Sequence, residues 1–170
     1  MKKEPTPSLA LICVDDEQGV LDALVRDLAP FEDHLVVEAA ASADEARDIV
    51  DSLSGRGCRL ALILCDHLMP GTTGTDFLIE LNRREDTRRA AKVLVTAQAG
   101  LEDTVRALNE AGLDHYIAKP WNPKELHEVA RKLLTDYVLT ENLDPMPWLA
   151  VLEVERVGEA LSRHNRYSDG

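Results

Sequence analysis

Cysteine is scarce in this 170-residue chain, and its spacing fits neither a disulfide framework nor a zinc site. The three cysteines, Cys13, Cys58 and Cys65, are an odd number, and no two of them are spaced as Cys-x-x-Cys. Cys13 and Cys65 lie within apolar runs, where cysteine behaves as a small hydrophobic side chain. We therefore expect reduced cysteines that pack in the core.

Long hydrophobic runs are also missing. The longest strongly apolar runs, such as residues 60–65, are far shorter than the ~20 residues that a membrane-spanning helix needs. Lys2 and Lys3 are not followed by the apolar stretch of a secretory signal peptide. These absences predict a soluble, cytoplasmic protein.

Positive charge is in deficit. The chain has 19 basic and 31 acidic side chains, a formal net charge of −12. Such an excess of carboxylates repels phosphate, which argues against nonspecific nucleic-acid binding and against docking on an anionic membrane. The apolar content of 45% is ordinary for a globular protein. At about 150 residues per domain, the length predicts one compact domain and a short remainder.

Five apolar runs alternate with five amphipathic segments. Ser42 and Glu45 form a capping box before the second amphipathic segment, and Asn122-Pro123 is a helix-start signal before the fifth. The predicted strands are 9–14, 34–39, 60–65, 93–95 and 115–118, and the predicted helices are 18–29, 42–53, 75–84, 101–111 and 123–135. This alternation predicts an α/β fold, a (βα)5 doubly wound parallel sheet with helices on both faces.

Chemically active side chains stand where the predicted strands end. Asp15 and Asp16 follow the first strand, Asp66 the third, Thr96 the fourth and Lys119 the fifth. The carboxyl ends of parallel strands meet at one edge of a sheet, so we expect these groups to converge. Three carboxylates repel one another unless a cation such as Mg²⁺ relieves them. A lysine, a threonine and a carboxylate nucleophile beside Mg²⁺ suit phosphoryl transfer.

The order and spacing of these residues closely resemble the receiver domain of two-component response regulators. The matching motifs are Asp15-Asp16, then Asp66-x-x-Met69-Pro70-Gly71, Thr96-Ala97, and Tyr116-x-x-Lys119-Pro120. The resemblance covers residues 9–135 and implies a flavodoxin-like five-stranded sheet of order 2-1-3-4-5.

The resemblance also implies a role for each site residue. Asp66 would be the phosphoacceptor, phosphorylated from the phosphohistidine of a sensor histidine kinase. Asp16, Asp66 and the backbone carbonyl of Leu68 would bind Mg²⁺, and Asp15 would act largely through bound water. Lys119 would pair with the phosphoryl group.

Thr96 and Tyr116 would be the switch pair: the hydroxyl moves toward the phosphoryl group and the ring turns inward. Leu68 and Gln98 flank the path of an attacking water in this family. The apolar Leu68 cannot orient that water, whereas the Gln98 amide could, and we expect a moderately long-lived phosphorylated state. His67, beside the acceptor, is expected to point elsewhere and to serve neither as a phosphohistidine nor as a metal ligand.

Trp121 follows the last predicted strand. The string Lys119-Pro120-Trp121-Asn122 resembles a receiver subgroup seen with cyclic-di-GMP phosphodiesterase outputs of the HD-GYP type and in kinase-linked receivers. A tryptophan here would lie near the fourth and fifth helices and suit an interface anchor. Packing over the sheet edge is the alternative.

The remainder, residues 136–170, is predicted to be a helical extension for interaction or dimerisation, or a linker, after a flexible segment 1–8 and a receiver domain 9–135. Residues 148–161 read as one helix that is apolar around most of its circumference. Val151, Val154, Val157 and Leu161 would form one face, and Trp148, Leu149 and Leu152 another. One face could pack on the receiver and the second could bind a partner, with Trp148 as a contact; a plain packing helix is the alternative.

These features predict a response regulator that signals through protein–protein contacts, is not an enzyme beyond its own phosphorylation chemistry, and forms a dimer through the extension and the fourth and fifth helices. The alternative is the N-terminal receiver of a multidomain regulator, for example one with a cyclic-di-GMP phosphodiesterase output. An aspartyl phosphatase is disfavoured because Asp66-His67-Leu68 lacks the Asp-x-Asp acid–base pair. A flavodoxin-like cofactor binder is disfavoured because the first strand exit has no glycine- or hydroxyl-rich phosphate loop.

Overall fold

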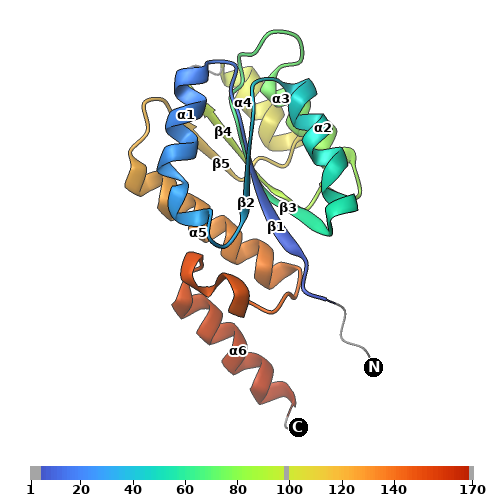
Figure 1. The fold of residues 1–170 in the computed structure, drawn as a ribbon, viewed down its shortest axis with the longest axis vertical. Coiled ribbons are helices and arrows are strands. Elements are labelled where there is room, and N and C mark those ends of the chain that lie inside the picture. The colour runs from blue at the N-terminus through green and yellow to red at the C-terminus, as the bar shows by residue number, and fades with distance from the viewer. Residues whose placement is uncertain (1–4, 98–99, 169–170) are drawn as a thin grey trace.

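The computed structural model describes residues 5–97 and 100–168. Five parallel strands form one sheet in the order β2-β1-β3-β4-β5 (Figure 1). The strands are β1 (Ser8–Val14), β2 (Val36–Ala40), β3 (Cys58–Cys65), β4 (Ala91–Thr96) and β5 (His115–Ala118). The predicted strands and their order are confirmed. The predicted flexible segment 1–8 lies partly outside the described residues, and β1 already begins at Ser8.

Each strand is followed by a helix, as predicted. The helices are α1 (Gln18–Asp27), α2 (Ala43–Leu53), α3 (Gly74–Arg83), α4 (Leu101–Glu110), α5 (Pro123–Thr140) and α6 (Val154–Ser168), with 3₁₀ turns η1 (Ala29–Phe31), η2 (Ser54–Arg56) and η3 (Met146–Val151). The capping signals act as expected: Ser42 Oγ accepts from Glu45 N at 3.1 Å, and Asn122 Oδ1 accepts from Lys124 N at 2.8 Å. No helix in these two described ranges is both long and apolar enough to cross a membrane.

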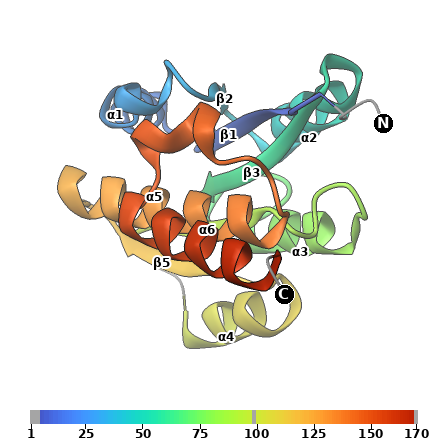
Figure 2. The same cartoon turned by 90° about the horizontal axis from the view of Figure 1, so that it is seen from below.

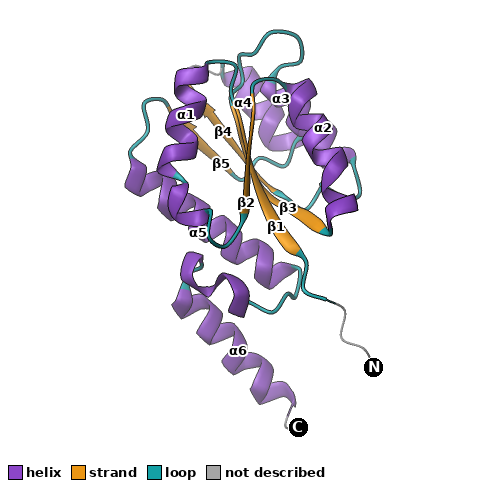
Figure 3. Cartoon of the chain, in the orientation of Figure 1, coloured by secondary structure: helices purple, strands orange, loops and turns teal. Residues whose placement is uncertain are grey.

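Helices cover both faces of the sheet, and the sheet separates the core into two layers (Figure 3). Helices α1 and α5 pack on one face, where Leu24, Phe31 and Leu134 belong to one buried cluster. Helices α2, α3 and α4 cover the other face, where Val50 and Phe77 belong to the second. β1 and β3 are buried almost throughout, as expected of central parallel strands.

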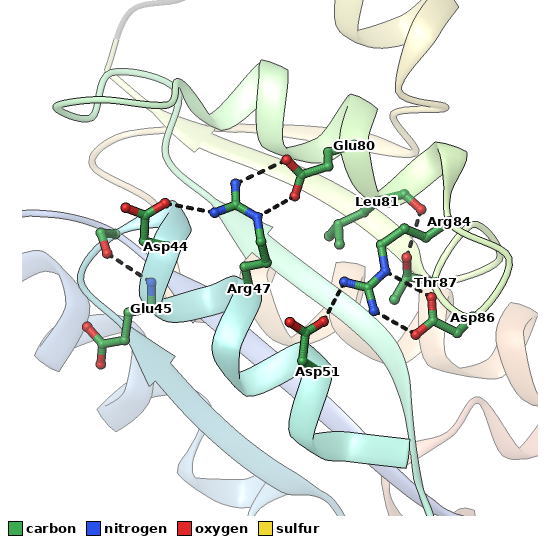
Figure 4. A network of polar contacts seen from close by, with 10 residues as sticks. Asp44, Glu45, Arg47, Asp51, Glu80, Leu81, Arg84, Asp86 and Thr87 are labelled. Carbon is green, nitrogen blue, oxygen red and sulfur yellow. Dashed lines mark hydrogen bonds and ion pairs between the residues drawn. The ribbon is translucent and has the colours of Figure 1, made fainter. Parts of the chain in front are cut away.

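Two arginines join α2 and the α3 region (Figure 4). Arg47 of α2 donates to both carboxylate oxygens of Glu80 of α3, at 2.7 and 3.0 Å, and also to Asp44 at 2.7 Å. Arg84, just after α3, donates to Asp51 of α2 at 2.8 Å. This edge of the molecule is therefore fastened by polar contacts in addition to the core.

Helix α4 buries fewer side chains than α2 or α3. Within the described chain, Ala107 is its only buried side chain. Its apolar residues Leu101, Val105 and Leu108 are 82%, 44% and 53% exposed. They recur at helical spacing, so α4 presents an apolar stripe to solvent.

The predicted single helix over 148–161 is wrong. The chain instead forms η3, becomes extended at Leu152 and restarts as α6, because Glu153 N donates to Thr135 Oγ1 of α5 at 2.8 Å. The break lets side chains from both predicted faces enter the α1/α5 core. Those buried are Trp148, Val151, Leu152 and Val157. Val154 and Leu161 remain 58% and 47% exposed.

The extension lies at the end of the molecule opposite the loops that follow the strands (Figures 1 and 2). Arg156 of α6 makes ion pairs with Glu153, at 3.1 Å, and with Asp136 of α5. Since its buried residues join the same cluster as α1 and α5, the extension is part of the receiver core.

Candidate functional site

Three carboxylates meet at the carboxyl edge of the sheet, as the sequence predicted. Asp15 and Asp16 follow β1, and Asp66 follows β3, the strand that pairs with β1. One oxygen from each lies within 4.8 Å of the others. Asp15 and Asp66 are only 1% and 7% exposed, whereas Asp16 is on the surface. Burial of neighbouring carboxylates is costly, so compensating positive charge is required.

Lys119 supplies part of that charge. Its Nζ lies 2.6 Å from Asp15 Oδ2 and 3.5 Å from Asp66 Oδ2. Burial lowers the pKa of Lys119, but the hydrogen bond and charge of Asp15 and the charge of Asp66 outweigh it, so the pKa is raised overall. The lysine therefore stays an ammonium that bridges β1 and β3 from the end of β5.

Backbone groups orient the two buried carboxylates. Asp15 Oδ1 accepts from Glu17 N at 2.9 Å, and Asp66 Oδ1 accepts from His67 N at 2.9 Å. Each carboxylate therefore receives a backbone amide on one oxygen and faces Lys119 with the other. These contacts fix the orientation of the Asp66 carboxylate at the carboxyl edge of the sheet.

Gly74 is a site residue that sequence reasoning missed. A Cβ at this position would lie 1.8 Å from the Asp66 carbonyl oxygen and 3.0 Å from His67 Cα. Gly74 N also donates to His67 O at 2.8 Å. Only glycine lets α3 begin this close to the segment that carries Asp66. The segment 67–74 contains two glycines, Gly71 and Gly74, and nothing in the sequence marked the close approach at Gly74.

Thr96 is the last residue of β4, and Tyr116 lies within the neighbouring strand β5, in register with Leu94. Thr96 is 1% exposed, and the Tyr116 hydroxyl donates to Thr96 O at 3.4 Å. Tyr116 is 36% exposed, so its ring is on the surface side of the sheet edge. Leu68 is 61% exposed in the loop after Asp66. Gln98 lies outside the described residues.

His67 points away from the carboxylates, as expected. Its ring is buried, with Nδ1 2.8 Å from Thr75 Oγ1 of α3 and Nε2 3.1 Å from Asp103 Oδ2 of α4. Both ring nitrogens are therefore occupied by protein groups.

The two tryptophans are not placed as predicted. Trp121 is part-buried, packs against the α1/α5 core, and donates from Nε1 to Asp27 Oδ2 of α1 at 2.9 Å. It therefore faces α1 rather than α4, which corresponds to the packing alternative. Trp148 is 3% exposed, because the break before α6 turns it into the core, so it offers no free contact surface.

The donor set fits Mg²⁺. The ligand atoms gathered here are carboxylate oxygens, the donors that this hard cation prefers. Three carboxylates face one nearby ammonium, so the pocket has an excess of two negative charges that a divalent cation would balance. Asp15, Asp16 and Asp66 are the groups that would hold it.

Comparisons with known proteins agree with this geometry. The family model "Response regulator receiver domain" matches residues 11–131. The hydrogenase transcriptional regulatory protein HoxA of Cupriavidus necator is 36% identical over 122 residues, which are 72% of this chain and 23% of HoxA. Response regulator Rre1 of Synechocystis is 34% identical over 131 residues, 74% of this chain and 52% of Rre1.

Solved structures show the same fold. A CheY-like response regulator receiver domain protein from Methanospirillum hungatei JF-1 has a TM-score of 0.66 and 31% identity, covering 76% of this chain and 96% of that one. The chain spans about a quarter of the first HoxA relative, 23% of its length. The family match, the sheet order and the carboxylate cluster with its lysine lead to one conclusion. This chain belongs to the response regulator receiver domain family.

Proposed function

We propose that this protein accepts a phosphoryl group on Asp66, from the phosphohistidine of a sensor histidine kinase and with Mg²⁺ bound. The single observation that carries the proposal is Lys119, whose ammonium lies 3.5 Å from Asp66 Oδ2 while it is fixed by Asp15 at 2.6 Å. An anchored cation beside an oriented, 7% exposed carboxylate is suited to a phosphoryl group arriving at that carboxylate.

In the proposed reaction, a carboxylate oxygen of Asp66 forms the new bond to phosphorus. The bond from phosphorus to the donor histidine nitrogen breaks, and that nitrogen keeps the electron pair. Lys119 pairs with the phosphoryl oxygens, and the His67 amide keeps the Asp66 carboxylate in position. When bound, Mg²⁺ neutralises negative charge on the transferred group.

The Thr96 and Tyr116 switch remains part of the proposal. The Tyr116 hydroxyl donates a hydrogen bond to the backbone carbonyl of Thr96, and this bond links the positions of the two residues. The exposed, apolar Leu68 offers no group that could orient an attacking water. We accordingly expect a phosphoaspartate that lasts longer than seconds, measured as decay after acetyl phosphate is removed.

The output is proposed to be protein–protein contact, in a cytoplasmic protein that is not an enzyme beyond its own phosphorylation. The exposed stripe of α4, Leu101, Val105 and Leu108, together with Tyr116 of β5, supports a partner or a second copy on this side. Sizing the protein in Mg²⁺ with and without beryllofluoride, a phosphoryl mimic, tests homodimerisation. A mass that stays monomeric in both states contradicts the dimer.

The acceptor is tested by labelling. Wild type incubated with acetyl phosphate and Mg²⁺ should gain one phosphoryl group by intact-mass measurement, and Asp66→Asn should gain none. Asp33→Asn, an exposed loop carboxylate, is the control and should label like wild type. Full labelling of Asp66→Asn would refute the acceptor assignment.

A second candidate is the receiver of a longer regulator. Its specific support is that the matched HoxA is a transcriptional regulatory protein of which this chain covers 23%. In that case α6 would join the receiver to an output, whether DNA-binding as that name implies or a cyclic-di-GMP phosphodiesterase. The reading frame beyond Gly170 decides between the two candidates.

A further inference from the structure

His67 is bonded on every polar atom that it has. Its backbone N–H donates to Asp66 Oδ1 at 2.9 Å, and its carbonyl accepts from Gly74 N at 2.8 Å. Its ring contacts Thr75 at 2.8 Å and Asp103 at 3.1 Å. One buried residue thus touches the phosphoacceptor, the start of α3 and the start of α4.

A neutral ring can satisfy both contacts in one arrangement of hydrogens. A carboxylate only accepts, so Nε2–H donates to Asp103 and, with a neutral ring, the Thr75 hydroxyl donates to Nδ1. Thr75 is fully buried, so the contact between Thr75 and the His67 ring is the fixed end of this series of hydrogen bonds. Asp103 lies in the first turn of the sparingly anchored α4 and is the end that can move.

Besides the buried Ala107, α4 has polar contacts with α3. Arg106 pairs with Asp76 at 2.8 Å, and Asn82 Nδ2 donates to Glu110 O at 3.0 Å. Residues 103, 106, 107 and 110 therefore form the side of α4 that faces α3, whereas residues 101, 105 and 108 form the exposed apolar stripe. A shift of the first turn would reorient that stripe.

We infer that His67 is a positioning residue that couples phosphorylation of Asp66 to helix α4 through Asp103, an inference that rests on the proposed function of Asp66. When Asp66 becomes an acyl phosphate, its negative charge moves to the phosphoryl oxygens. The hydrogen bond from His67 N to Asp66 Oδ1 then loses its charge assistance and weakens. The His67 backbone is released at one of its contacts, and the ring carries the change to Asp103 and the first turn of α4.

The test compares hydrogen–deuterium exchange of residues 101–110 in Mg²⁺ with and without beryllofluoride. Wild type should show a change in α4 exchange, and Asp103→Ala should reduce that change at least about fivefold, the lower range of typical allosteric couplings. Asp76→Ala is the matched control: Asp76 also lies in a first turn, is similarly exposed, and among the described residues of α4 pairs with Arg106. It should keep the wild-type change.

Asp103→Asn supplies the rescue, because its amide oxygen can still accept from Nε2–H. Asp103→Asn should restore most of the wild-type change in α4 exchange. Both substitutions remove the charge of Asp103, so a difference between them would not be explained by loss of surface charge alone. Occupancy is checked separately by whether beryllofluoride blocks labelling of Asp66 by acetyl phosphate. A wild type that is not labelled refutes the proposed function. A labelled wild type without an α4 change, or a labelled Asp103→Ala with the full change, overturns the coupling role.

Discussion

At the scale of single residues, Gly74 decides whether the acceptor segment can be built. The Cβ of an alanine would lie 1.8 Å from a backbone oxygen of Asp66, a contact that no side-chain rotation can relieve. We predict that Gly74→Ala destabilises the fold by about 3 kcal/mol or more, the upper range for overpacking, and lowers labelling of Asp66. Urea unfolding and acetyl phosphate labelling measure the two effects.

Gly19 in α1 is the control for this substitution. Nothing lies within 4 Å of a Cβ there, so Gly19→Ala should stabilise the protein by up to about 1 kcal/mol through helix propensity. Equal effects of the two substitutions would contradict the steric argument.

Lys92 in β4 predicts a pH dependence of stability. It is 1% exposed, and its Nζ donates to Arg88 O at 3.0 Å and Ala90 O at 2.8 Å. Burial lowers the pKa of Lys92 from 10.5 to about 8, against the smaller effect of the Asp114 charge. Between about pH 8 and pH 10.5, Lys92 is protonated in the unfolded chain but has lost its proton in the folded chain. Lys92 therefore makes the free energy of unfolding rise with pH in this range.

The comparison with Lys92→Met isolates that contribution. The difference in unfolding free energy, wild type minus variant, should increase by about 1 to 3 kcal/mol between pH 7.5 and pH 10. The carbonyls left without a donor in the variant add a constant that does not depend on pH. A difference that stays flat or falls over this range would show that Lys92 keeps its ordinary pKa.

The charged residues of the site were predictable, because Asp15, Asp66 and Lys119 each directly follow a strand. The convergence of Asp15, Asp16, Asp66 and Lys119 follows from the parallel topology. The contacts of His67 and Gly74 were not predictable, since they depend on how closely α3 and α4 approach the loop after β3. Side-chain direction in that loop has no fixed sequence period.

At the scale of elements, the two arginines between α2 and α3 carry a measurable coupling. Arg47 and Glu80 make a two-point contact with side chains 31% and 40% exposed. A double-mutant cycle with Arg47→Met and Glu80→Gln should give about 0.5 to 1 kcal/mol of coupling in urea unfolding, decreasing in high salt. The pair Arg163 and Glu159 on α6, 3.6 Å apart and 69% and 68% exposed, should give nearly zero in the same cycle.

A larger coupling in the α6 pair than in the Arg47 pair would contradict this assignment. The α2–α3 contacts fasten these two helices to each other, whereas α4, on the same face of the sheet, contributes a single buried side chain to the described core. This difference in anchoring between helices on the same face is why a signal from Asp66 is expected to move α4 rather than α2.

Helices with one buried face and strands with continuous apolar runs were predicted well, since both patterns are clear in the sequence. The segment 148–161 failed for the opposite reason: it is apolar around most of its circumference, and a continuous helix would leave part of that apolar surface in water. The hydroxyl of Thr135 accepts from Glu153 N and allows the chain to break and to bury side chains from both faces. Such a tertiary contact, 18 residues away in sequence, leaves no periodic signal.

At the scale of the whole molecule, the extension and the receiver share one core. Trp148, from the extension, is 3% exposed and belongs to the same buried cluster as Leu9 of β1 and Phe31 after α1. A shared core predicts one cooperative unfolding transition for residues on both sides of the proposed boundary at 135.

We predict that Trp148→Ala destabilises the entire protein by about 3 to 5 kcal/mol, the usual cost of removing a buried tryptophan. The chain has two tryptophans, so in this variant the fluorescence of Trp121, in the receiver core, reports the receiver alone. Its urea midpoint should fall together with the helical signal. Tyr167→Ala, at a residue 86% exposed near the end of α6, is the control and should stay within about 0.5 kcal/mol of wild type. If the Trp121 transition kept its wild-type midpoint in Trp148→Ala, the extension would be an independent segment, and its contacts with α1 and α5 would not stabilise the receiver.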